Sequence, residues 1–129
     1  MAAEPDSIAL AGLLGLQSGI DPQEAESRLR LLIVREGAQP ALLAALGKLL
    51  ARQGRWLEAQ ESFFQAWTAD PNQPDVAFNL AVSLERIRQP AVALSYYRRA
   101  LDLGGAHKAH FDAAVAQERV LALTPRQPE

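Results

Sequence analysis

The sequence contains no cysteine, few aromatic residues and no block of charge of one sign. The absence of cysteine and the absence of a charged block each remove a class of function. Without cysteine there are no disulfides, no thiolate zinc sites and no cysteine nucleophile, and the redox compartment stays open. The formal charge of −2 at pH 7 is spread along the chain as alternating Arg and Glu. No basic stripe is available to follow a phosphate backbone, so we expect no nucleic-acid partner.

A long hydrophobic run is also missing. The most apolar stretch near the start, residues 8–16, is too short to span a bilayer and contains Gly12 and Gly15. It follows the acidic Glu4 and Asp6, whereas a signal peptide begins with basic residues. We therefore expect no direct membrane insertion by this chain. It reads as soluble, and its compartment stays undetermined: cytoplasmic, or periplasmic if it is part of a longer envelope protein.

What the sequence does contain is Ala and Leu in abundance, which favours helices, and an internal repeat. Shifting the chain by 34 residues aligns the same residue types, and a fixed period of this size is the signature of a repeat architecture. The first repeat matches weakly, through Ala25 and Leu29. The strong pairs are Leu46 with Leu80, Leu50 with Leu84, Ala59 with Ala93, Phe63 with Tyr97, and Ala66 with Ala100.

The repeated residues have mechanical roles. Gly47 and Ala59 are small where two helices cross closely, and Phe63 fills the space between one helix pair and the next. Gly54 permits a tight turn, and Pro71 stops a helix. An ordinary antiparallel helical bundle would also show Leu and Ala at helical spacing. A bundle has no reason to repeat the small residues, the aromatic residue and the turn at a fixed interval.

The pattern Leu43-x-x-Leu46-Gly47-x-x-Leu50, Gly54, Ala59-x-x-x-Phe63-x-x-Ala66 and Pro71 resembles the tetratricopeptide repeat, and the resemblance covers residues 6–107. It implies an all-α fold, a right-handed superhelix of three helix pairs plus a C-terminal capping helix. One domain is expected over residues 1–123, with repeats at 6–39, 40–73 and 74–107, a capping helix at 106–123 and a flexible tail at 124–129. The helices are expected at residues 7–17, 22–35, 40–53, 56–69, 74–87, 90–103 and 106–123.

Candidates for chemistry are few. His107 and His110 lie three residues apart near Asp112, at the expected start of the last helix, a spacing that could place two metal ligands on one face. A solvent-facing pair is the simpler interpretation. No Gly-x-Ser-x-Gly elbow and no Gly-rich phosphate loop is present, so we expect neither a cofactor nor catalysis. A small metal-binding protein or enzyme that uses the two histidines remains the alternative from a different class.

The resemblance implies a protein or peptide ligand, bound on the concave face formed by the first helix of each pair. Phe78 and Val82 are apolar residues there that the repeat does not require, and Phe78 either anchors a ligand or packs between helices. Asn79 matches an asparagine of members that clamp chaperone tails, but Ala109 and Ala113 stand where that clamp needs Lys and Arg. The predicted binding residues are Lys48, Arg52, Phe78, Asn79, Val82, Glu85, Arg86 and Arg119.

The third repeat suggests a setting. Residues 78–85, 88–90 and 96–101 resemble the last repeat of bacterial tetratricopeptide proteins of pilus biogenesis and type II-like secretion, such as the MshN-like proteins of the mannose-sensitive haemagglutinin pilus. This resemblance implies a scaffold for assembling secretion machinery. A free cytoplasmic adaptor is the alternative, and the residues specify no oligomeric state.

Overall fold

The computed structural model describes residues 21–126, and the helix expected at residues 7–17 lies outside that range. The described residues form helices and no strand, as expected for an all-α chain. The helices are α2 (Pro22–Glu36), α3 (Pro40–Arg52), α4 (Trp56–Ala69), α5 (Pro74–Arg86), α6 (Pro90–Gly104) and α7 (Ala113–Leu123).

The helix ends follow from local chemistry. Four helices carry proline in the first turn, where the missing N–H costs no hydrogen bond; these are Pro22, Pro40, Pro74 and Pro90. Helix α4 ends at Ala69, two residues before Pro71, as the sequence predicts. The turn from α3 to α4 passes through Gly54, whose φ of 75° lies in the left-handed region.

The crossing of α3 and α4 depends on a glycine. A Cβ atom placed on Gly47 would lie 2.7 Å from Cε1 of Phe63, closer than van der Waals contact allows. The small residues Ala59 and Ala93 are fully buried, and Phe63 and Tyr97 are almost fully buried. The small and aromatic residues of the repeat are therefore buried, and Gly47 allows α3 and α4 to approach closely.

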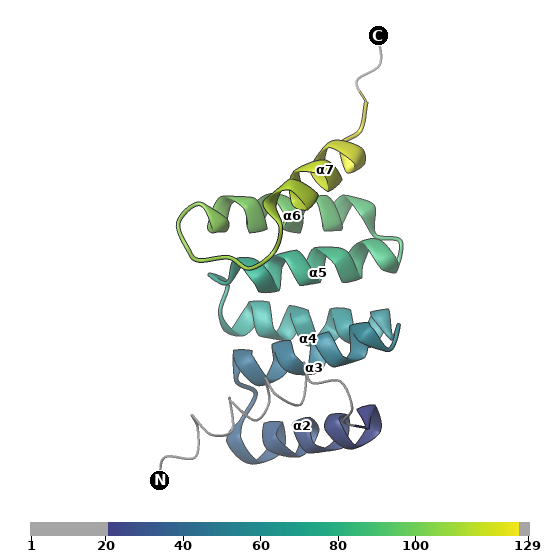
Figure 1. Ribbon diagram of the computed structural model, residues 1–129, viewed down its shortest axis with the longest axis vertical. Coiled ribbons are helices and arrows are strands. Elements are labelled where there is room, and N and C mark those ends of the chain that lie inside the picture. The colour runs from purple at the N-terminus through teal and green to yellow at the C-terminus, as the bar shows by residue number, and fades with distance from the viewer. Residues whose placement is uncertain (1–20, 127–129) are drawn as a thin grey trace.

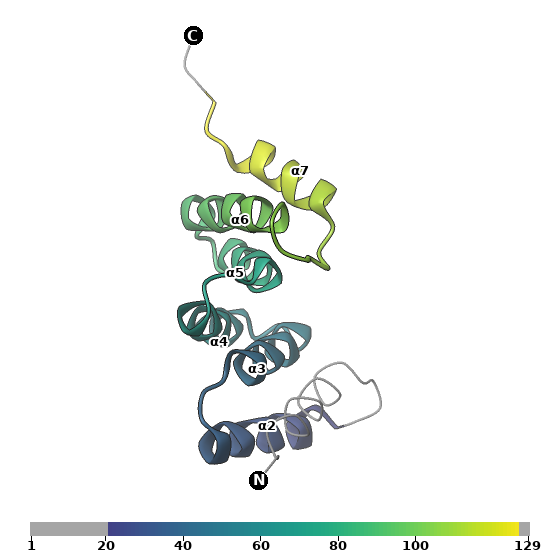
Figure 2. The same cartoon turned by 90° about the vertical axis from the view of Figure 1, so that its left-hand side faces the viewer.

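Each helix packs mainly on its neighbours in sequence, and α3 also contacts α5. Figure 1 shows α2 to α7 stacked along one axis. After a quarter turn, Figure 2 shows α3, α5 and α7 on one side of the stack, while α4 and α6 lie toward the other. This is the tetratricopeptide arrangement of stacked helix pairs, and α7 covers the last complete pair.

The last helix begins later than expected. It starts at Ala113 rather than Ala106, so His107 and His110 lie in the α6–α7 loop and not on one helical face. Asp112 caps α7, since its side chain accepts a hydrogen bond from the N–H of Ala114 at 2.9 Å. The N–H groups of His110 and Phe111 are held by Asp75 instead of by a helix.

Candidate functional site

A groove runs along the side of the stack formed by α3 and α5. It consists of two adjoining hollows with volumes of about 480 Å³ and 310 Å³. Lys48 of α3 and Phe78 and Asn79 of α5 line both hollows, which makes them continuous. The larger hollow extends to Phe111 in the α6–α7 loop, and the smaller one extends to Trp56 at the start of α4.

The groove has an apolar floor and polar edges. The apolar residues Ala51, Phe63 and Val82 line the smaller hollow together with Arg52. Among residues 21–126, the ammonium group of Lys48 forms no ion pair and the side-chain amide of Asn79 forms no hydrogen bond. Both groups are thus available to a ligand that lies over the floor.

Phe78 is half-buried, and much of its ring already has neighbours. It stacks on Phe111 with the ring planes 6° apart and the centroids 4.8 Å apart. It also meets the ring of Tyr97 edge-on, with a centroid distance of 5.7 Å. The structure thus corresponds to the packing interpretation of Phe78, although the ring still borders both hollows.

Glu85 and Arg119 form an ion pair with each other. Both Nε and an amino group of Arg119 donate to the Glu85 carboxylate, with Nε at 3.2 Å, and the Tyr97 hydroxyl donates to Oε1 at 3.0 Å. Burial raises the pKa of Glu85, but the hydrogen bonds from Arg119 and Tyr97 outweigh it and leave the pKa below its ordinary value. Burial, and then Glu85, raises the pKa of Tyr97. This cluster ties α5 to both α6 and α7.

Arg86 lies over the ring of Trp56, with its guanidinium carbon 5.0 Å from the ring centroid. The structure therefore brings five of the predicted residues to one groove: Lys48, Arg52, Phe78, Asn79 and Val82. It places the other three predicted residues in internal contacts: Arg86 on Trp56, and Glu85 with Arg119.

Asp75, at the start of α5, holds the α6–α7 loop. Its Oδ1 accepts hydrogen bonds from the N–H groups of His110 at 2.8 Å and Phe111 at 2.9 Å, and its Oδ2 lies 2.9 Å from Nδ1 of His110. Burial raises the pKa of Asp75, yet the hydrogen bonds from the His110 ring and the two backbone N–H groups bring it below its ordinary value. Phe111 was not among the predicted site residues, because the loop that brings it to α5 was expected to be helical. Trp56, which lines the smaller hollow, was not among them either.

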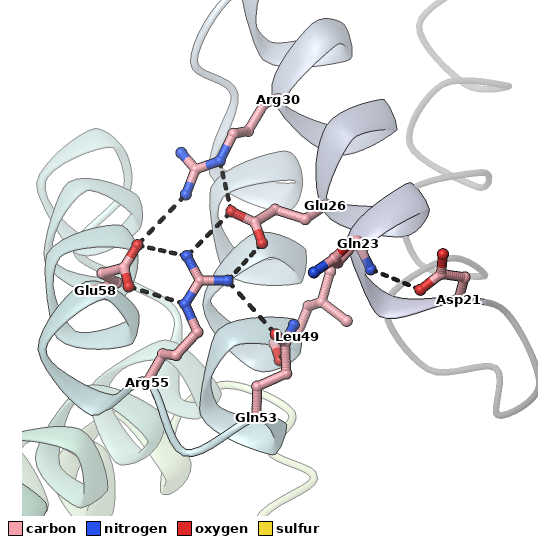
Figure 3. A network of polar contacts seen from close by, with 8 residues as sticks. All are labelled: Asp21, Gln23, Glu26, Arg30, Leu49, Gln53, Arg55 and Glu58. Atoms are coloured by element: carbon pink, nitrogen blue, oxygen red, sulfur yellow. Dashed lines mark hydrogen bonds and ion pairs between the residues drawn. The ribbon is translucent and has the colours of Figure 1, made fainter.

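A second polar cluster lies outside the groove, where α2 meets the start of α4 (Figure 3). Arg55 donates to both Glu26 and Glu58, at 2.5 Å and 2.7 Å, and Arg30 donates to Glu26 at 2.9 Å. The hydrogen bond from Arg55 is the main cause that lowers the pKa of Glu26 and of Glu58. The charged groups of this cluster are paired with one another and join two helices, so we assign it a role in stability rather than in binding.

Neither a metal-binding cluster nor a membrane-spanning helix is found among the described residues. Residues 21–126 contain no cluster of three or more histidine and carboxylate side chains that could hold a metal ion. His110, one of the two histidines considered as ligands, is the partner of Asp75. None of the helices described here combines the length and the apolar character that crossing a bilayer requires.

Comparison of the sequence with known proteins finds a relative over part of the chain. No model of a known protein family matches the chain. Human protein O-mannosyl-transferase TMTC3 is 34% identical over 74 residues, which cover 56% of this chain and 8% of that protein. The chain therefore spans a small part of the length of that relative.

Solved structures of bacterial secretion chaperones are similar over nearly the whole chain. PcrH from Pseudomonas aeruginosa superposes with a TM-score of 0.79 and 23% identity, covering 93% of each chain. The Yersinia enterocolitica type III secretion chaperone SycD, in complex with a peptide of the translocator YopD, gives a TM-score of 0.80 and 22% identity over 95% of this chain and 93% of that one. At these identities the likeness establishes a shared fold.

Proposed function

We propose that this tetratricopeptide-fold chain is a protein-binding module that holds a segment of another protein in the groove between α3 and α5, and that it catalyses no reaction. The observation that carries the proposal is the groove, where Lys48 and Asn79 offer polar groups with no side-chain partner among residues 21–126, beside apolar lining residues. An apolar anchor with a polar rim is the usual arrangement at a protein interface. The eight residues predicted from the sequence are proposed in two roles: five as groove contacts, and Glu85, Arg86 and Arg119 as supports for its walls.

The proposed setting is the assembly of a secretion or pilus machine. The resemblance of the third repeat to pilus-biogenesis proteins supports it, as does the fold shared with PcrH and SycD, which were solved with a region of PopD and a peptide of YopD. A free cytoplasmic adaptor is the alternative within the same class. The transferase activity in the name of TMTC3 is not proposed here, because the similarity covers 8% of that protein.

The test is affinity capture from cell extracts with the native protein and a Lys48→Glu, Asn79→Ala double variant, read by mass spectrometry. Both changed side chains line the groove, and neither forms a hydrogen bond or ion pair with another side chain among residues 21–126. Phe78 and Arg86 are less suitable positions, since Phe78 packs on two rings and Arg86 on Trp56. Arg28→Glu on the exposed face of α2 is the charge-matched control.

We expect proteins that the native chain and the Arg28→Glu control recover and the double variant loses. Secretion or pilus components among them would support the proposed setting, and other cytoplasmic proteins would favour the adaptor. Equal recovery by all three proteins would contradict the groove as the binding surface. Trp56 then reports the contact directly: in a Trp67→Phe background it is the remaining tryptophan, and its fluorescence should change when a ligand enters the smaller hollow.

A further inference from the structure

The α6–α7 loop, residues 105–112, occupies one end of the groove. Figure 1 shows it descending from α6 across α5 before it turns into α7. Its side chain Phe111 lies flat on Phe78, and both rings border the larger hollow with Lys48 and Asn79. A segment of the chain itself therefore lies where a bound segment of another protein would lie.

Few contacts hold this loop in place. Asp75 accepts its two successive N–H groups, at His110 and Phe111, and also contacts the His110 ring, while the Phe111 ring packs on Phe78. The rest of the loop is largely in solvent: the His110 side chain is 76% exposed, and Gly105 to Lys108 are exposed. Exposed segments with few apolar contacts open at lower free energy than the packed helices.

The helices on either side do not depend on the part of the loop that lies in the groove, His110 and Phe111. The N–H groups of Ala106 and His107 close the end of α6 by donating to the Leu103 carbonyl, and Asp112 caps α7 by accepting from the N–H of Ala114. Helix α7 is anchored separately by the buried Ala116 and by the ion pair of Arg119 with Glu85. The loop can therefore lift from the groove while α6 and α7 stay packed.

We propose that residues 105–112 are an internal occupant of the groove, which a partner displaces by placing an aromatic side chain of its own on Phe78 in the position of Phe111. This inference rests on the proposed function, because it names what the partner brings to that groove. The seated ring shows that this face of Phe78 accepts a parallel aromatic ring. The hollow continues from that point past Lys48 and Asn79, so a segment that follows the groove reaches the position of Phe111. Only molecules with an open loop bind the partner. The apparent affinity for the partner is therefore the intrinsic affinity multiplied by the fraction of molecules whose loop is open.

The test uses N-acetyl-L-phenylalaninamide as the probe, titrated into isotope-labelled protein and followed by amide chemical shifts in NMR. Phe111→Ala removes the ring and leaves the Phe78 face open, and Asp75→Ala releases the loop but keeps the ring. Phe64→Ala, which removes an exposed ring on α4 outside the groove, is the matched control. N-acetyl-L-leucinamide serves as the non-aromatic probe.

We expect Phe111→Ala to bind the aromatic probe roughly tenfold more tightly than the native protein, with the largest shifts at Phe78 and Asn79. Asp75→Ala should bind with intermediate affinity, Phe64→Ala should match the native protein, and the leucine probe should bind more weakly. Equal affinity of the native and Phe111→Ala proteins would overturn the inference, as would equal binding of the two probes. If Phe111→Ala fails to fold, Asp75→Ala decides in the same way.

Failure of this inference is distinguishable from failure of the proposed function. For a captured partner, Phe111→Ala should strengthen binding and Lys48→Glu should weaken it. A partner that is sensitive to Lys48→Glu but not to Phe111→Ala would contradict displacement of the loop and leave the groove as the binding surface. A partner that ignores Lys48→Glu would contradict the proposed function, whatever the probe does.

Discussion

Arg88 occupies the position 34 residues after Gly54, and the two share an unusual backbone conformation. Their φ angles are 65° and 75°, both in the left-handed region, and both residues lie in the turn inside a helix pair. Glycine adopts this region freely, whereas a residue with a Cβ atom is strained there by about 1 kcal/mol. The turn geometry belongs to the repeat. The third repeat, residues 74–107, forms this turn with Arg88 in place of the glycine that suits it best.

Replacing Arg88 by glycine should therefore stabilise the protein. We expect Arg88→Gly to raise the free energy of unfolding by about 0.5 to 1 kcal/mol, because relief of strain exceeds the added entropy of the unfolded chain. Urea unfolding followed by circular dichroism measures the change. Arg88→Ala is the control, since it removes the exposed guanidinium and keeps the Cβ atom, and it should leave the stability unchanged. A stabilisation of the same size in Arg88→Ala would assign the effect to charge rather than to backbone strain.

At the scale of the helices, close crossing within each pair sets the spacing of the stack. Gly47 lies against the ring of Phe63, and the matching alanines on the second helix of each pair, Ala59 and Ala93, are fully buried. Packed interiors leave little room for added methylene groups. The helices of a pair are thus held at a distance that their small residues define.

Enlarging those alanines should destabilise the fold. Ala59→Leu or Ala93→Leu is expected to lower the free energy of unfolding by roughly 1 to 3 kcal/mol through overpacking at the crossing. Chemical denaturation monitored by circular dichroism gives the value. Ala91→Leu is the matched control, because Ala91 is exposed on the same helix as Ala93 and its replacement should change the stability little. Neutral results at both buried positions would show that the crossings are looser than this geometry implies.

At the scale of the whole molecule, charged groups connect elements that lie far apart in the sequence. Arg55 joins the start of α4 to Glu26 on α2, Asp75 joins α5 to the α6–α7 loop, and Glu85 joins α5 to α7. In a stack where each helix packs mainly on its sequence neighbours, these bridges add contacts across the repeats. Their carboxylates all have a lowered pKa in the folded protein.

The stability of the protein should consequently fall at acid pH. A carboxyl group whose pKa is lower in the folded than in the unfolded protein stabilises the fold above its unfolded pKa, and this contribution is lost as the pH falls through the folded pKa. We expect a free energy of unfolding that is nearly constant between pH 7 and about pH 5 and decreases below about pH 4.5. Denaturant unfolding at a series of pH values measures the profile.

One carboxylate can be tested within that profile. On acidification, Glu85→Gln should lose about 0.5 to 1 kcal/mol less of its free energy of unfolding than the native protein does. The difference is modest because part of the Glu85 side chain stays hydrated. Glu61→Gln, an exposed carboxylate of α4 with no ion pair among residues 21–126, is the control and should leave the profile unchanged. An identical acid loss in the Glu85→Gln and native proteins would mean that the bridge from α5 to α7 contributes nothing to the pH dependence.

Periodicity and turn residues by themselves determined the repeating part of this protein. Small residues, one aromatic residue, a glycine turn and proline first turns recur along the sequence, and each acts through neighbours within the same helix pair. The bounds of α2 to α6 were therefore predictable to within one residue, with α4 correct at both ends. The repeat also specifies which face each helix turns inward, and five of the residues predicted on α3 and α5 line the groove. Their part in binding stays a prediction.

Only the tertiary structure decided which segment lies at the end of the groove and which of the charged residues near it pair with each other. The start of α7 depends on Asp75 of α5, which lies 35 residues before His110 in the sequence. Its carboxylate accepts the N–H groups of His110 and Phe111, which would otherwise be free to join a longer helix. The pairing of Glu85 with Arg119 spans 34 residues. No local signal encodes such contacts, because they form only once the stacking of the helices has brought distant side chains together.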